Sequence, residues 1–192
     1  MSAHRLPLFP LHTVLFPGGV LPLRVFETRY LDMVSDCLRN DHGFGVCLIR
    51  AGREVGTAPD CHGLGTLARI RDWDRTPEGL LLITAEGERR FRITEQTVRA
   101  DQLIVAEVDY LDDPPPQPLP LEYARLARLL DALLDDLDAP YRDLPRRLDD
   151  AGWVGARLVE FLPLDPLEKQ SLLEEGDVLA RLAAVAAHLG RG

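Results

Sequence analysis

The 192-residue sequence has few of the residues on which several common protein chemistries depend. It contains one lysine, Lys169, and no GxxxxGK[ST] phosphate-binding loop, which excludes nucleotide hydrolysis of the P-loop type. Lys169 and Ser171 lie two residues apart on an expected helix, so they point about 200° apart and are poorly placed for a Ser-Lys catalytic pair. No apolar run reaches the roughly 18–20 residues of a membrane-spanning helix. We therefore expect neither ATPase nor Ser-Lys protease chemistry, and no membrane partner.

Basic charge is scarce as well. The chain carries 22 Lys and Arg against 31 Asp and Glu, a net charge of −9, whereas nucleic-acid binders usually show a basic patch or stripe. The N-terminal MSAHRLPLFP lacks the features of a signal peptide. Three cysteines cannot all pair within one chain, so no disulfide framework is expected. These features predict a reduced, cytoplasmic protein that does not bind nucleic acid.

Cysteine and histidine occur without the CxxC or HExxH spacing of metal sites, so neither a metal nor a cofactor is expected. Cys37 falls at a core position of an expected helix, and Cys47 falls within an apolar strand. Cys61 and His62 are adjacent in a segment, Arg50–Gly63, that its polar composition predicts to be a long loop or an irregular hairpin. This pair leaves one alternative open, a hydrolase with a cryptic Cys/His site.

Prolines interrupt the apolar N-terminal segment from Arg5 to Tyr30 and exclude a continuous helix there. Two short strands separated by a turn suit such a segment, because proline is tolerated at strand starts, sheet edges and turns. Phe16–Gly19 (FPGG) has proline and glycine in the order that a turn favours. We therefore expect strands at Leu6–Phe9 and Val20–Phe26 around this turn.

Helical spacing of apolar residues then predicts a helix over Glu27–Leu38. Alternating or short apolar runs predict further strands after it. These strands are Phe44–Ile49, Leu64–Trp73, Gly79–Ala85, Glu88–Ile93 and Leu103–Leu111.

A proline-rich segment, residues 113–120, separates the β-rich part from a part with only helical patterns. Trp153–Leu162 is one expected helix, and Val178–Leu189 is another. Asp165-Pro166-Leu167-Glu168 predicts a helix start with an N-cap, a proline at the first position and a glutamate at the third. The expected fold class is α+β: a β-rich domain at 1–112, a linker at 113–120 and a helical bundle at 121–192.

The motifs in the first domain resemble those of the N-terminal substrate-recognition domain of ATP-dependent Lon proteases; cereblon carries a similar domain. The matching residues are Phe16-Pro17, Pro22-Leu23, Phe26-Glu27-Thr28-Arg29-Tyr30, the FGVCLI strand, Gly65-Thr66-Leu67-Ala68 and Gly87-Glu88-Arg89-Arg90-Phe91-Arg92-Ile93. The resemblance covers Leu6 to about Leu111, and the LPLDPLEKQSLLEEGDVLARL stretch resembles the helical end of these domains. It implies a twisted β-barrel of PUA-like type with one helix, followed by a helical bundle.

The resemblance also implies a function. Lon continues into ATPase and protease modules, whereas this sequence stops at Gly192, so a stand-alone, non-catalytic protein-binding module is expected. Its expected partners are unfolded or extended polypeptide segments, with a protease and a second copy of the chain as further candidates. An RNA-associated PUA-like role is the other alternative, against which the acidic composition argues.

Six motif residues are candidates for peptide contact. They are Phe16, Pro17, Phe26, Arg29 and Tyr30, with Arg90 as a polar anchor. Each has a competing interpretation as a residue that fixes the turn or the sheet, and Arg29 has one as a buried ion-pair partner. The cluster Arg89–Arg92 suits a carboxylate or a chain terminus, with cross-strand ion pairing as the alternative.

Overall fold

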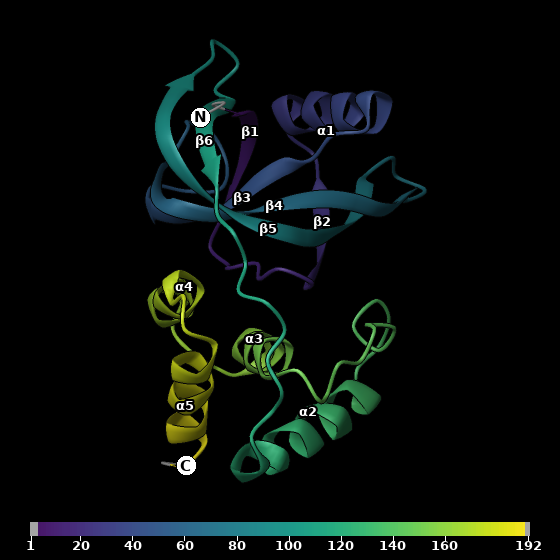
Figure 1. Cartoon of the computed structure of the whole chain (residues 1–192). Helices are drawn as coiled ribbons and strands as arrows, with labels where there is room; N and C mark the ends of the chain where they lie inside the picture. The colour runs from purple at the N-terminus through teal and green to yellow at the C-terminus, as the bar shows by residue number, and fades with distance from the viewer. Residues whose placement is uncertain (1–3, 191–192) are drawn as a thin grey trace. The chain divides into compact units, whose positions relative to one another are not determined.

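The computed structural model describes residues 4–190 and divides the chain into two compact units, residues 1–112 and 113–192 (Figure 1). The described residues confirm the α+β class, with a six-stranded sheet in the first unit. The first unit contains β1 (His4–Leu11), β2 (Val20–Val25), α1 (Thr28–Asn40), β3 (Phe44–Ala51), β4 (Asp60–Arg75), β5 (Leu81–Val98) and β6 (Ile104–Tyr110). The second contains the 3₁₀ turn η1 (Leu121–Tyr123) and the helices α2 (Ala124–Asp136), α3 (Ala151–Phe161), α4 (Pro166–Glu174) and α5 (Val178–Leu189).

The strand order of the first unit is β2-β5-β4-β3-β1-β6, and β5 also pairs with β6. Five strands therefore form a closed ring of pairings, while β2 pairs with β5 outside the ring. β1 changes partner along its length: His4–Pro7 pairs antiparallel with β6, and Leu8–Leu11 pairs parallel with β3. A PUA-like barrel stays a prediction that this topology is compatible with.

β5 corrects the sequence prediction of two strands, Gly79–Ala85 and Glu88–Ile93, because it runs unbroken over 18 residues. Gly87 lies within it and contacts the Phe16–Gly19 turn: its N–H donates to the Gly19 carbonyl at 2.9 Å, and the Gly18 N–H donates to the Gly87 carbonyl at 2.7 Å. A Cβ at Gly87 would lie 2.4 Å from the Phe16 carbonyl oxygen. Glycine here permits a close backbone approach and does not end the strand.

The Arg50–Gly63 segment forms an irregular hairpin rather than a long loop, because β3 extends to Ala51, β4 begins at Asp60 and the two strands pair antiparallel with register shifts. The connecting loop is therefore residues 52–59. Cys61 and His62 belong to β4, and the Cys61 side chain is buried.

Two hydrophobic clusters stabilise the first unit. One takes side chains from all five strands of the ring and includes the fully buried Phe91. A Cβ at Gly45 or at Gly65 would lie 2.7 Å from the Phe91 ring, so these glycines leave the space that the ring fills. The other cluster includes the buried apolar residues of α1, which recur at helical spacing: Tyr30, Met33, Val34 and Cys37.

The burial of α1 predicts a loss of stability in alkali. Burial raises the pKa of the Cys37 thiol from 9.0 to about 12 and that of Tyr30 from 10.0 to about 12. Between the ordinary and the raised values the folded state binds more protons than the unfolded state, so stability is complete below about pH 9 and falls as the pH rises. At about 1.4 kcal/mol per unit, Cys37 should account for about 2 kcal/mol of the loss between pH 7.5 and 10.5. The free energy of unfolding, determined in urea at both pH values, measures this loss.

The Cys37→Ala variant is the comparison that isolates this effect. It lacks the thiol, so its free energy of unfolding should fall less between the two pH values than that of the wild type, whatever its stability at pH 7.5. An equal fall in both proteins would contradict the assignment to Cys37.

The second unit packs α2, α4 and α5 against α3, in which Trp153, Val154, Leu158 and Val159 are buried. The predicted capping box is confirmed: Asp165 caps α4, and the Glu168 side chain accepts from the Asp165 N–H at 3.2 Å. The end of the proline-rich segment belongs to this unit, because the Leu119 N–H donates to the Asp149 carbonyl at 2.8 Å. Among residues 4–190, no helix is long and apolar enough to cross a membrane.

Candidate functional site

Most of the motif residues that the sequence nominated for peptide contact face the interior. Phe16 is fully buried, Tyr30 packs against Phe9 with ring centroids 4.2 Å apart, and Arg90 is buried in β5. Pro17 is half-buried in its turn. Phe26 is the exposed member of the set, with 59% of its surface accessible. Peptide contact by these residues stays a prediction, and the exposed position of Phe26 makes it the natural starting point.

Arg29 is a buried cation, only 5% exposed, that contacts two loops of the first unit. Its guanidinium forms an ion pair with Glu27 at 3.1 Å and donates to the carbonyl oxygens of Gln102 at 3.0 Å and Glu54 at 3.5 Å. It also lies 4.6 Å from the centroid of the Tyr30 ring. Arg29 thus joins α1 to the β3–β4 loop and to the β5–β6 loop, as the ion-pair interpretation of the sequence anticipates.

One hollow beside Arg29 is lined mostly by apolar residues, together with Arg24, Glu27 and Glu54, and we call it the apolar groove. Its volume is about 260 Å³. It lies along β2, the start of α1 and the β3–β4 loop, and its exposed apolar side chains include Phe26 and Val55, which is 53% accessible. The lining residues are Phe9, Leu11, Pro22, Leu23, Arg24, Val25, Phe26, Glu27, Tyr30, Glu54 and Val55.

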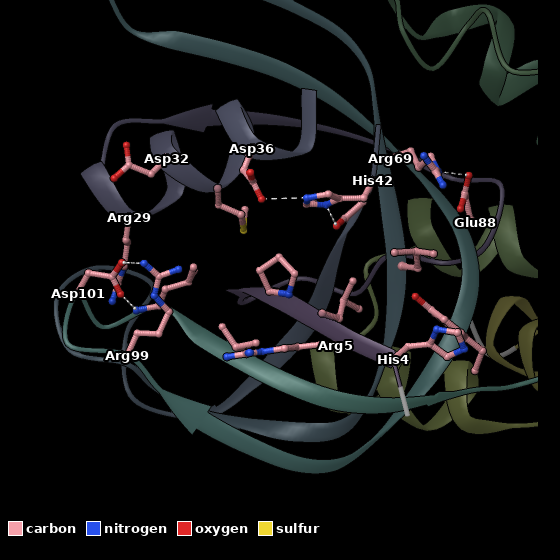
Figure 2. Close-up of a pocket in the computed structure, with 18 of the residues that line it drawn as sticks. His4, Arg5, Arg29, Asp32, Asp36, His42, Arg69, Glu88, Arg99 and Asp101 are labelled. Atoms are coloured by element: carbon pink, nitrogen blue, oxygen red, sulfur yellow. Dashed lines mark hydrogen bonds and ion pairs between the residues drawn. The ribbon is translucent and has the colours of Figure 1, made fainter. Parts of the chain in front are cut away.

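A larger hollow, which we call the charged cavity, has a volume of about 800 Å³ (Figure 2). Its apolar lining comes from β1, α1, β4, β6 and the β5–β6 loop, and its charged side chains come from β1, α1, β4, β5 and the β5–β6 loop. The charged lining residues are Arg5, Arg29, Asp32, Asp36, Arg69, Glu88, Arg89, Arg99 and Asp101.

Most carboxylates of the charged cavity already have a cationic or hydrogen-bonding partner. Glu88 pairs with Arg69 at 2.9 Å, and Asp101 pairs with Arg99 at 2.9 Å. The His42 ring lies 2.9 Å from Asp36, and this hydrogen bond lowers the pKa of the Asp36 carboxyl below its usual value.

Among the described residues that line the cavity, Arg5 and Arg89 form no ion pair. The Arg89 guanidinium lies over the Tyr110 ring, 3.7 Å from its centroid. The Arg89–Arg92 cluster of the sequence is therefore divided by strand alternation: Arg89 lines the cavity, and Arg90 is buried.

The Cys61/His62 pair has poor geometry for a thiol–imidazole couple. Both residues lie in β4, where neighbouring side chains project to opposite faces. Cys61 packs with Cys47 in the cluster around Phe91, and the hydrogen bond between the two thiols, together with burial, raises the pKa of Cys47 well above its usual value. The described residues also contain no group of three or more His, Cys, Asp or Glu side chains that could hold a metal ion.

Comparison with known families gives a direct match. The family model of the ATP-dependent protease La (LON) substrate-binding domain matches residues 5–191, nearly the whole sequence. The chain belongs to the Lon substrate-binding domain family. Both units are included in that match, so the α-helical unit is part of the family's domain together with the strand ring.

Relatives of known sequence and structure agree with this assignment. A crystal structure of a Lon N-terminal domain protein from Xanthomonas campestris is 41% identical, with a TM-score of 0.78 over 96% of this chain and 98% of that one. The N-terminal domain of the Mycobacterium avium complex Lon protease is 21% identical over 95% of this chain and 96% of that one, with a TM-score of 0.63, and shows the same fold. Lon protease 2 of Myxococcus xanthus is 31% identical over 97% of this chain but over only 23% of its own length.

The chain thus spans about a quarter of the length of the curated Lon proteases that it matches. Within its 192 residues it contains the substrate-binding domain and neither the protease nor the ATPase domain.

Sequence reasoning missed both hollows as sites. The charged cavity combines residues from His4 to Tyr110, which no local motif connects. Two signals were available: Arg29, which the sequence nominated for peptide contact, and the Arg89–Arg92 cluster, for which the sequence suggested binding of a carboxylate. No sequence pattern marks Val55 as a binding residue, because the loop that carries it has the composition of ordinary polar surface.

Proposed function

We propose that this protein is a non-catalytic module that binds extended, apolar segments of other polypeptides, and that the apolar groove is where it holds them. The observation that carries the proposal is the exposure of Phe26 and Val55 at a groove beside β2. The family's description as a substrate-binding domain supports a polypeptide as the partner. A second copy of the chain and a protease remain proposed partners of the same kind.

The edge of β2 supports an extended rather than a helical partner. Among the described residues β2 pairs with β5 alone, so its other edge is not covered by a strand. Pro22–Val25 of β2 line the groove. An extended peptide laid along this edge would gain main-chain hydrogen bonds, and its alternate side chains would enter the apolar lining. Pro22 has no N–H to donate, which limits such pairing and disfavours uncontrolled edge-to-edge association.

A direct test uses a denatured client without ATP. The wild-type protein should suppress aggregation of a chemically unfolded client, followed by light scattering, and should bind a fluorescent, extended apolar peptide in fluorescence anisotropy. The Val55→Asp variant should bind that peptide at least about tenfold more weakly, because a carboxylate at the groove must be desolvated by an apolar ligand.

Val98→Asp is the matched control, since Val98 is 52% exposed, nearly as much as Val55, and does not line the groove. It should retain wild-type peptide affinity. Trp73 tests the competing location, because it is 54% exposed and lines a neighbouring hollow of about 390 Å³, which shares only Pro22–Arg24 of β2 with the groove. Loss of binding in Trp73→Ser together with wild-type affinity in Val55→Asp would show that the groove assignment is wrong.

A further inference from the structure

The charged cavity has the composition of a site for an anion rather than for an apolar chain. Its lining carries five arginines against four carboxylates, in a protein whose net charge is −9. Three of those carboxylates are engaged by Arg69, Arg99 and His42. Asp32 remains as a carboxylate without an ion-pair partner among the described residues, against the two guanidinium groups of Arg5 and Arg89.

Arg29 supplies an independent sign of a missing acceptor. It lines the cavity, its side chain is 4% exposed, and its Nε has no hydrogen-bond partner in the described structure. A buried donor without an acceptor costs free energy, and a ligand oxygen would remove that cost. The terminal nitrogens of Arg29 are already held by Glu27, Glu54 and Gln102, so the guanidinium is fixed in place before any ligand arrives.

Figure 2 shows Arg29, Arg99 and the Arg5 side chain toward one end of the cavity, whereas Arg69 lies with Glu88 toward the other end. The Arg29 side chain leaves α1 toward Arg99 and Asp101, and the Arg5 side chain extends toward the same end. Asp32 lies above this end on α1. The geometry points to a binding site for a carboxylate of a client polypeptide, held by Arg5 and Arg29 with Arg99 beside them.

This inference rests on the proposed function, because the carboxylate is taken to belong to the captured polypeptide. Two sources have the same chemistry, the C-terminal carboxylate of a chain and an Asp or Glu side chain. Guanidinium groups bind both through charge-assisted hydrogen bonds. Because this attraction is electrostatic, the site is expected to bind carboxylates more tightly than their neutral counterparts, and its affinity is expected to fall with salt. The negative charge of Asp32 opposes the binding of either source.

A peptide series tests the inference and separates the two sources. One apolar peptide is prepared with a free C-terminus, with a C-terminal amide, and as an amide with one internal Glu or Gln. At low salt the wild type should bind a carboxylate-bearing form about tenfold more tightly than its neutral counterpart: the free acid if the terminus is read, the Glu peptide if a side chain is read. The Arg5→Gln variant should lose this preference and keep the affinity for the amide, and Asp32→Asn should increase the preference about twofold.

A probe that does not need the apolar groove makes the test independent of the proposed function. N-acetyl-leucine should shift the Arg29 Nε–Hε signal in proton–nitrogen spectra saturably, whereas N-acetyl-leucinamide should leave it unchanged. A shift retained in Val55→Asp would support the cavity even if peptide capture by the groove failed. Equal affinities for charged and neutral peptides, together with no saturable shift from N-acetyl-leucine, would overturn the inference while leaving groove binding of the amide intact. An unchanged carboxylate preference in Arg5→Gln would overturn it as well.

Discussion

Replacing Gly65 with alanine should destabilise the first unit severely. A Cβ on this residue would lie 2.4 Å from the Val46 carbonyl oxygen and 2.7 Å from the Phe91 ring. The first of these contacts is with the backbone of β3, the partner strand of β4, so it cannot be relieved by a side-chain rotation. Overpacking of a filled core costs about 1–3 kcal/mol, and a backbone clash raises the cost beyond that. We expect a loss of at least about 3 kcal/mol in urea unfolding, or failure to accumulate in soluble form.

Gly63 is the matched control for Gly65. It lies two residues earlier in the same strand, has no atom within 4 Å of an added Cβ, and does not require the left-handed backbone region. The Gly63→Ala variant should fold with a stability within about 0.5 kcal/mol of the wild type, as surface substitutions usually do. Equal stabilities of the Gly65→Ala and Gly63→Ala variants would contradict the close packing of β3 and β4 around Phe91.

The second large effect is expected from Arg29→Met, which keeps most of the side chain's volume and removes its charge and donors. The substitution leaves the Glu27 carboxylate and the carbonyl oxygens of Gln102 and Glu54 without the donors that Arg29 supplies. Removing one partner of a buried ion pair costs about 3–5 kcal/mol. Because the Glu27 side chain is 19% exposed and partly screened, we expect about 2–4 kcal/mol in urea unfolding.

Arg39→Met is the control on the same helix, since Arg39 is exposed and donates to the Ser35 hydroxyl at 2.9 Å. Its stability should change by less than about 0.5 kcal/mol. Amide hydrogen exchange adds a local measurement: in Arg29→Met, exchange should accelerate in the 52–59 loop and around Gln102, the two segments that the guanidinium connects. Unchanged exchange in both segments would show that Arg29 does not hold these loops.

The comparison of sequence and structure shows which features local chemistry determines. The Phe16–Gly19 turn could be predicted because proline and glycine restrict the backbone locally, and the α4 start because its cap lies within four residues. The role of Gly87 could not be predicted locally, because it depends on a turn about 70 residues earlier in the chain, where the Phe16 carbonyl approaches it. Cys61 was placed in a loop because its flanking residues are polar, yet pairing with Ile49 makes it part of β4.

The candidate sites were less predictable for the same physical reason. Burial of Phe16 and Tyr30 follows from tertiary packing, so conspicuous aromatic residues in a motif turned out to lie in the interior. Val55, whose exposure helps to define the groove, is unremarkable in the sequence. The cavity depends on the ring closure that brings β1 to β6, and no periodicity within a single segment reports that closure.

That closure also bears on how the protein is made. His4–Pro7 pairs with residues 105–108, and about a hundred residues separate the two strands. During synthesis on the ribosome, β1 must wait for β6 before its first half gains a strand partner, and contacts of such long sequence separation form slowly. Until β6 has been synthesised, residues 4–7 of the nascent chain therefore lack their strand partner, while residues 8–11 can already pair with β3. In this interval a protein proposed to capture extended segments presents one of its own, and unpaired strand edges of this kind are prone to misassociation during synthesis.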